Sequence, residues 1–143
     1  MLKMDTKTGR TSEVAQIRGG GGPFLSPNGQ YMAVGYAEGD TPETFANRIA
    51  IFDLKTGSKF ADLFVPLGNR NTTFGADSNS MLFAIFGKEN YYLSTSFETA
   101  ESQRVPGVPP DVQGLGFSPD GKQALIIRLR EQRELAAINE VED

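Results

Sequence analysis

Three acidic side chains, Glu38, Asp40 and Glu43, stand close together in one polar stretch of the sequence. Carboxylate oxygens at such spacing are ligands that Ca²⁺ accepts. The stretch lacks the spacing of an EF-hand loop, so we interpret residues 36–47 as a solvated acidic loop without a metal. The same stretch carries Phe45. Because inserted loops often form the binding face of a protein, these four residues are the leading candidates for contact with a protein partner.

Two serines, Ser26 and Ser118, are each followed by proline. A nucleophilic serine needs a base within hydrogen-bond reach, and the sequence contains no histidine to serve as one. We therefore expect both hydroxyls to bond to the turns that follow them. Cysteine is also absent, which excludes disulfides and thiolate metal sites. The sequence thus predicts no catalytic residues, no metal and no cofactor.

Four consecutive glycines occupy residues 19–22. Such a run can offer backbone N–H groups to a phosphate, but this one lacks the Lys-Ser/Thr pair of a P-loop. Pro23 and Phe24 follow it and read as the start of a strand rather than a helix, so we interpret the run as a flexible connector. The net charge of −4 argues against nucleic acid or an anionic membrane as a partner.

The segments that must position these residues recur along the chain. Residues 118–121 read Ser-Pro-Asp-Gly between two apolar segments, which is typical of two strands joined by a tight turn. Residues 26–29 read Ser-Pro-Asn-Gly in the same setting. A degenerate copy of this motif runs from Phe74 to Ile85, and there we place Asn79 at the glycine position.

A second kind of turn has Asp followed, four residues later, by Gly. We expect the Asp side chain to accept hydrogen bonds from the turn and the Gly to adopt a positive φ. Degenerate copies have Ser96 with Ala100, and Asn139 near the C-terminus. The predicted structural turn residues of both kinds are Asp5, Gly9, Pro27, Asn28, Gly29, Asp53, Gly57, Pro119, Asp120 and Gly121.

The two kinds of turn recur at similar intervals. The separations are 48, 43 and 43 residues along Asp5, Asp53, Ser96 and Asn139, and 50 and 42 residues along Gly29, Asn79 and Gly121. A unit of about 40–45 residues with four short strands is the period of a β-propeller blade. An insertion over residues 36–47 accounts for the longer first interval.

These motifs resemble the WD40-like repeats of TolB-type β-propellers over nearly the whole chain. The resemblance implies an all-β fold of propeller-type repeats and carries over structural positions only. The sequence has no tryptophan and no histidine, so it lacks the Trp-Asp and Gly-His signatures of standard WD40 repeats. With 143 residues, 22% charged and 38% hydrophobic, the chain suits a single folded domain.

The repeat register predicts about three four-stranded blades. Labelling the strands of a unit a to d, the chain opens with c and d over 1–17, continues with blades over 23–65 and 72–106, and closes with a, b and c over 114–139. Propellers typically have four to eight blades. The chain is therefore part of a larger propeller, a half-ring completed by a second chain, or an open arc whose bare edges favour pairing.

The predictions for three further segments are less specific. Mixed charge over residues 129–142 would suit a helix, but the repeat register favours a strand over 135–139. Phe86, Tyr91 and Tyr92 flank a predicted hairpin turn, and we expect them to pack in the core rather than to anchor a partner. Residues 105–110 are rich in proline and read as a stiff connector between units.

The sequence favours a non-enzymatic propeller scaffold that contacts another protein or another copy of itself. One alternative is the substrate-gating propeller segment of a larger hydrolase, and another is a propeller that binds a small ligand or sugar. No apolar run reaches the roughly 18 residues that span a bilayer, and residues 1–10 are too polar for a secretion signal. These two absences favour the cytoplasm.

Overall fold

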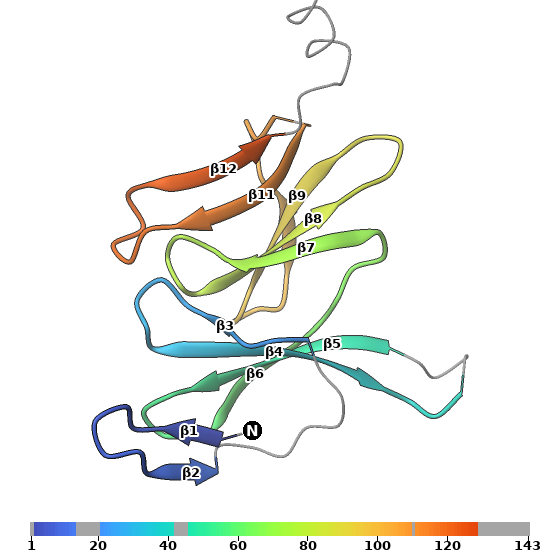
Figure 1. Cartoon of the computed structure of the whole chain (residues 1–143). Helices are drawn as coiled ribbons and strands as arrows, with labels where there is room; N and C mark the ends of the chain where they lie inside the picture. The colour runs from blue at the N-terminus through green and yellow to red at the C-terminus, as the bar shows by residue number, and fades with distance from the viewer. Residues whose placement is uncertain (1, 14–20, 42–45, 110, 129–143) are drawn as a thin grey trace, which may run out of the picture.

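The computed structural model describes residues 2–13, 21–41, 46–109 and 111–128 (Figure 1). These residues form strands and turns, and they include no helix long and apolar enough to cross a bilayer. The strands are β1 (Leu2–Met4), β2 (Thr11–Glu13), β3 (Phe24–Leu25), β4 (Tyr31–Glu38), β5 (Ala46–Asp53), β6 (Lys59–Phe64), β7 (Asn69–Phe74), β8 (Ser80–Ile85), β9 (Tyr91–Ser96), β10 (Ser102–Arg104), β11 (Val112–Phe117) and β12 (Ala124–Arg128).

The strands form four antiparallel sheets in which sequence neighbours pair. The first sheet has the order β3-β4-β5-β6 and the second has the order β7-β8-β9-β10, while β1-β2 and β11-β12 form sheets of two strands. The sheets are stacked one beside the next, with β1-β2 at one flank and β11-β12 at the other (Figure 1). The all-β fold predicted from the repeats is therefore observed.

The sheet boundaries differ somewhat from the predicted blades. The first sheet spans residues 24–64, against a predicted 23–65. The second spans residues 69–104, against a predicted 72–106, and its β7–β8 ladder has an irregularity between Asn69 and Asn71. Two parts of the prediction lie outside the described residues: the end of the opening segment (14–17) and the closing strand over 135–139.

Two hydrophobic cores lie between the sheets. The first joins the two four-stranded sheets and consists of Tyr31, Ala33, Ile49, Ile51, Leu63, Phe74, Met81, Phe83, Ile85 and Phe97. The second joins the second sheet to β11 and consists of Leu82, Ala84, Tyr92 and Val112, with Phe86 packed against it. Tyr91 packs against the first core.

Strand β8 contributes to both cores. Its odd-numbered residues Met81 and Phe83 belong to the first core, whereas Leu82 and Ala84 belong to the second. Successive side chains of a strand point to opposite faces of its sheet, so one apolar run serves both sides. This explains why the strand reads as a continuous hydrophobic segment rather than an alternating one.

All the Ser-Pro-Asx-Gly turns lie at one end of the sheets, which we call the turn end (left in Figure 1). In the second sheet, Ser78 has a φ of 60° and donates its N–H to the Gly75 carbonyl, as Gly29 does to Ser26. The prediction that Asn79 holds the glycine position is therefore wrong by one residue. This degenerate copy has glycine where the others have serine, which removed the landmark that aligns the turns.

The turns of neighbouring sheets contact one another at the turn end. The N–H of Asn28 donates to Ser78 Oγ at 3.2 Å, across the boundary between the first and second sheets. On the other side, a Cβ at Gly121 would overlap the carbonyl oxygen of Ala76. The absence of a side chain at this glycine therefore lets the outer turn approach the backbone of the middle one.

The second kind of turn is found in three hairpins, β1-β2, β5-β6 and β9-β10. Asp53 Oδ1 accepts hydrogen bonds from the N–H groups of Lys55 and Thr56 at 2.7 and 3.0 Å. Asp5 accepts the same two bonds in its turn. In the third copy, Ser96 Oγ accepts longer bonds of 3.2 and 3.4 Å, and Ala100 takes the positive φ, 57°, that glycine takes elsewhere.

Candidate interaction site at the loop end

We call the end of the sheets opposite the turn end the loop end (right in Figure 1). The described residues of the connections there are 39–41, 65–68, 86–90, 105–109 and 111, which join the sheets or their middle strands. The insertion predicted over 36–47 is partly strand, because β4 runs to Glu38 and β5 begins at Ala46. Its outer residues therefore lengthen a hairpin that projects from the loop end.

Two of the four predicted contact residues, Glu38 and Asp40, lie in the described part of this hairpin. Glu38 ends β4 and its side chain is 62% exposed, at 3.5 Å from Arg48 Nε. Asp40 is exposed in the bend that follows. Glu43 and Phe45 lie outside the described residues. The structure thus brings Glu38 beside a cation that sequence reasoning did not single out.

A cluster of polar side chains ties the three long strands of the first sheet together at this end. Its centre is Asp62, which accepts hydrogen bonds from Tyr36 Oη at 2.6 Å, Arg48 Nε at 2.9 Å and Lys59 Nζ at 2.9 Å. Burial alone would raise the pKa of Asp62, but these three donors outweigh it and hold the pKa below 3.8. The guanidinium of Arg48 also lies over the ring of Phe64, at 4.1 Å.

We call Tyr36, Arg48, Lys59 and Asp62 the Asp62 cluster. Sequence reasoning missed it because its members are separated by up to 26 residues and no motif connects them. The one available signal was the strand register. Tyr36 pairs with Arg48 on β5 and Ala50 pairs with Asp62 on β6, so the three side chains share one region of the sheet.

A pocket of about 440 Å³ opens at the loop end between the first and second sheets. The Asp62 cluster contributes Tyr36 and Arg48 to its wall, and Asn69 and Thr72 come from β7. Asn69 donates to Thr72 Oγ1 at 3.0 Å, but its own Oδ1 is buried without a hydrogen-bond partner among the described residues. Asn69 therefore contributes to the pocket wall a side chain whose oxygen has no donor among the described residues, which is uncommon for a buried polar group.

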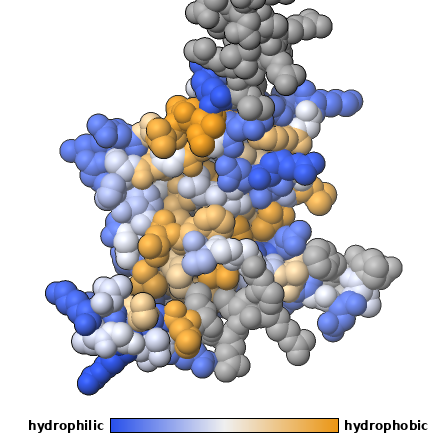
Figure 2. Space-filling view, in the orientation of Figure 1, coloured by the Kyte–Doolittle hydropathy of each residue, from blue (hydrophilic) through white to orange (hydrophobic). Residues whose placement is uncertain are grey.

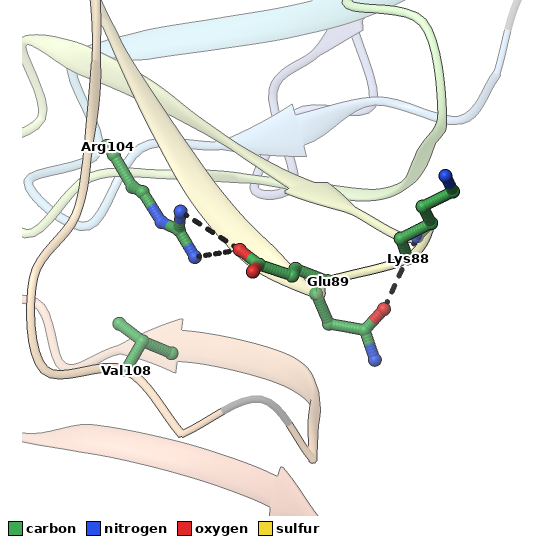
Figure 3. A pocket seen from close by; sticks show the side chains of 6 residues that line it. Lys88, Glu89, Arg104 and Val108 are labelled. Atoms are coloured by element: carbon green, nitrogen blue, oxygen red, sulfur yellow. Dashed lines mark hydrogen bonds and ion pairs between the residues drawn. The ribbon is translucent and has the colours of Figure 1, made fainter.

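A second pocket, of about 470 Å³, occupies the corresponding place at the outer side of the second sheet (Figure 3). It lies between the turn at residues 87–90 and the connector at Val108. Arg104 points toward Glu89 across it, with the atoms 3.4 Å apart, and its guanidinium lies 4.6 Å from the ring of Tyr91. Both pockets therefore have an arginine on their wall that is held by an acid and by an aromatic ring.

The serines and glycines considered for chemistry have structural partners. Ser26 Oγ donates to Asn28 Oδ1 at 2.7 Å and accepts from Tyr31 N at 2.9 Å. Ser118 makes the same pair of bonds within its own turn. In the glycine run, Gly21 donates its N–H to Gly35 at 3.1 Å, which uses a group that a phosphate would need. Gly19 and Gly20 lie outside the described residues.

The predicted structural turn residues all lie at the turn end. Gly9, Gly29, Gly57 and Gly121 have φ values between 69° and 74°. Asn28 Oδ1 accepts from Gln30 N, and Asp120 Oδ1 accepts from Lys122 N, which closes each turn. None of these residues faces either pocket. Within the described ranges, no three acidic side chains converge as metal ligands would.

By sequence, neither a protein-family model nor a curated protein matches the chain. Three solved structures resemble it in fold. The chain aligns over 90% of its length with TolB from Acinetobacter baumannii, with a TM-score of 0.57 and 18% identity. It aligns over 79% with the acylaminoacyl peptidase of Pyrococcus horikoshii, with a TM-score of 0.51 and 15% identity. It aligns over 87% with hydrazine synthase of Kuenenia stuttgartiensis, with a TM-score of 0.54 and 14% identity.

The chain has the fold of part of a TolB-type β-propeller. It spans 31% of the TolB chain, 17% of the peptidase chain and 42% of the hydrazine synthase chain. The two four-stranded sheets are thus blades, hereafter the first and second blade, and β1-β2 and β11-β12 are half-blades. The sequence predicted about three blades; the described residues contain two complete ones and two halves.

Proposed function

We propose that this chain is a non-enzymatic propeller scaffold that binds another protein at its loop end. The observation that carries the proposal is the pocket between the two blades, where the lining residue Asn69 has a buried Oδ1 without a donor among the described residues. Leaving a buried acceptor unpaired costs about 1–3 kcal/mol. A partner that brings an N–H or O–H group into the pocket would recover much of that free energy.

The charge around the pocket supports a partner with a basic side chain. The charges of Arg48 and Lys59 are balanced by those of Asp62 and Glu38. The exposed carboxylate of Asp40, in the bend after β4, therefore leaves this group of described residues with one negative charge in excess. Charge complementarity of this kind governs the choice of partner and the association rate more than the total affinity. The occupant that fits is a protein segment that presents Lys or Arg.

The test is recovery of the partner from the cells that produce this chain, followed by charge reversal. The partner recovered with the wild-type chain should be lost, or bind at least tenfold more weakly by calorimetry, with Glu38→Lys/Asp40→Lys. The matched control is Glu98→Lys/Glu101→Lys, which makes the same change of net charge at two exposed residues of the turn after β9, at the turn end.

Retention of the partner by the loop-end variant would contradict the assignment of this face. Loss with both variants would also contradict it, since binding would then follow net charge rather than position. If the wild-type chain recovers no protein at all, the scaffold proposal itself fails.

One comparison favours a second candidate, the propeller segment of a larger hydrolase. The chain resembles part of a structure named as an acylaminoacyl peptidase, and it spans only 17% of that chain. In this alternative the propeller positions substrate for catalytic residues on another domain. An antibody against this chain would detect a native species much larger than 15.5 kDa, and that species would carry peptidase activity. A native species of 15.5 kDa would exclude it.

A further inference from the structure

The two half-blades are complementary in kind. Strands β11 and β12 are joined by a Ser-Pro-Asp-Gly turn, as β3 and β4 are, so they occupy the a and b positions of a blade. Strands β1 and β2 are joined by an Asp turn, as β5 and β6 are, so they occupy the c and d positions. Together the two halves contain the four strands of one blade.

Within one copy the two halves are held apart, because both complete blades stand between them (Figure 1). Each half shows a surface that its counterparts bury. Leu2 and Met4 on β1 are 66% and 58% exposed, and Leu125 and Ile126 on β12 are 76% and 46% exposed. Figure 2 shows hydrophobic side chains at the surface over the β11-β12 half-blade. Among the described residues, no strand pairs with the outer edge of β1 or of β12. Exposed apolar strands with such an edge are prone to pair with another strand.

The counterparts of these residues show what the missing contact is. Superposing the Gly121 turn on the Gly29 turn makes Ile126 the counterpart of Val34. Superposing Asp5 on Asp53 makes Leu2 the counterpart of Ala50. Val34 and Ala50 pair directly across β4 and β5, and both are buried, at 8% and 2% exposure.

The same register holds in the second blade, where Phe83 occupies the position of Val34 and pairs with Leu93. We infer that β12 of one copy pairs with β1 of a second copy in this register, with Ile126 opposite Leu2, so that β1 takes the c position to which the repeat register assigned residues 135–139. The inference rests on the proposed scaffold function and names a second copy of this chain as the partner at the half-blades.

Pairing of this kind closes a ring. The described residues of each copy form two complete blades and two halves, and the halves of two copies make two composite blades. The total is six, within the range of about four to eight that propellers use. The arrangement has two-fold symmetry, as most homodimers do. The loop end, with its pockets, remains free for the partner proposed above.

The test uses the full chain, which has no cysteine of its own. Light scattering should give twice the 15.5 kDa mass of one chain. Mild oxidation of Leu2→Cys/Ile126→Cys should give a disulfide-linked dimer on a non-reducing gel. The control is Leu2→Cys/Leu67→Cys, since Leu67 is 97% exposed at the loop end and should not be trapped.

A second pair of variants separates the interface from the fold. Ile126→Lys should weaken dimerisation at least tenfold, while Leu67→Lys should leave it unchanged, and circular dichroism should show both folded. A chain that is monomeric at every concentration overturns the inference, and so does equal crosslinking through Leu67. Neither result would affect recovery of the loop-end partner, so the two proposals fail separately.

Discussion

At the scale of single residues, the middle turn shows how one hydroxyl can be supplied from two places in the sequence. In the first and last turns the hydroxyl belongs to the serine at the start, Ser26 or Ser118. In the middle turn that position is Gly75, and the hydroxyl comes from Ser80, which donates to Asp77 Oδ1 at 3.1 Å. A Cβ on Gly75 would overlap Ser80 Oγ.

This exchange predicts compensation between two positions. Gly75→Ser alone should destabilise the chain by about 1–3 kcal/mol, because the new side chain overlaps Ser80. Combining it with Ser80→Ala should recover at least half of that loss, since the hydroxyl returns to the place it has in the other turns. Urea unfolding of the four members of the double-mutant cycle measures the coupling. Additive losses would show that the two serines do not share one site.

Replacing a glycine at positive φ has two costs in free energy, backbone strain and steric overlap, and the sequence alone could not distinguish them. From sequence, valine at Gly57 or Gly121 is expected to cost about 1–2 kcal/mol through the left-handed backbone alone. The structure leaves open space around Gly57 but puts the Ala76 carbonyl against Gly121. Gly57→Val should therefore keep the predicted cost, and Gly121→Val should cost about 1–3 kcal/mol more, from overlap. Equal losses in chemical denaturation would rule out the contact with Ala76.

At the scale of elements, the Asp62 cluster holds β4, β5 and β6 in register where the hairpin of the insertion leaves the blade. Three donors converge on one carboxylate whose side chain is 18% exposed. A half-buried, hydrogen-bonded charge of this kind contributes more than a surface ion pair. Arg48 of this cluster lies 3.5 Å from Glu38 at the loop end. The cluster therefore links the stability of the blade to the proposed binding face.

The cluster predicts how stability depends on pH. Folding lowers the pKa of Asp62, so its contribution is complete above the ordinary value of 3.8 and is lost as the pH falls through the lower folded value. Asp62→Asn should cost about 1.5–3 kcal/mol at pH 7, where bonds to a charged acceptor are lost. The difference between variant and wild type should shrink below pH 4. Thermal unfolding from pH 7 to pH 3 measures it, and a constant difference would contradict this role.

The sequence predicts an element well when residues close together in the chain determine it, and poorly when it depends on the pairing of distant strands. The all-β propeller repeats followed from turn residues and apolar runs, which act over a few positions. The one-residue error at Asn79 arose where Gly75 had replaced the expected serine. The Asp62 cluster could not be predicted, because Tyr36 and Asp62 meet only through the pairing of three strands. The strand expected over 135–139 lies outside the described residues and stays a prediction.

At the scale of the whole molecule, one aromatic residue joins the two blades. Phe97 follows β9 and is 8% exposed, with Tyr31 and Phe60 of the first blade at ring distances of 6.4 and 6.3 Å. Phe74 of its own blade lies at 5.9 Å. Edge-to-face pairs of this kind add about 0.5–1.5 kcal/mol each to the burial of the ring. The rings of Tyr31, Phe74 and Phe97 are therefore the part of the first core that couples the two blades at the turn end.

Phe97→Ala should destabilise the chain by about 3–5 kcal/mol, the range for a buried phenylalanine. The loss should appear in both blades, so amide exchange should accelerate in β4 and in β8 together. Phe60→Ala is the matched control, because Phe60 is 52% exposed and should cost much less. Faster exchange confined to the second blade would show that Phe97 stabilises its own blade alone.

The alternation along β8 has a consequence for how the molecule comes apart. Because its odd and even side chains face different cores, the second blade is a shared wall between two compartments. Water entering beside Val112 would contact Leu82 and Ala84. It would not reach Met81 and Phe83, which lie on the opposite face of the sheet. Separation of the β11-β12 half-blade from the second blade would therefore expose the second core while leaving the first core buried.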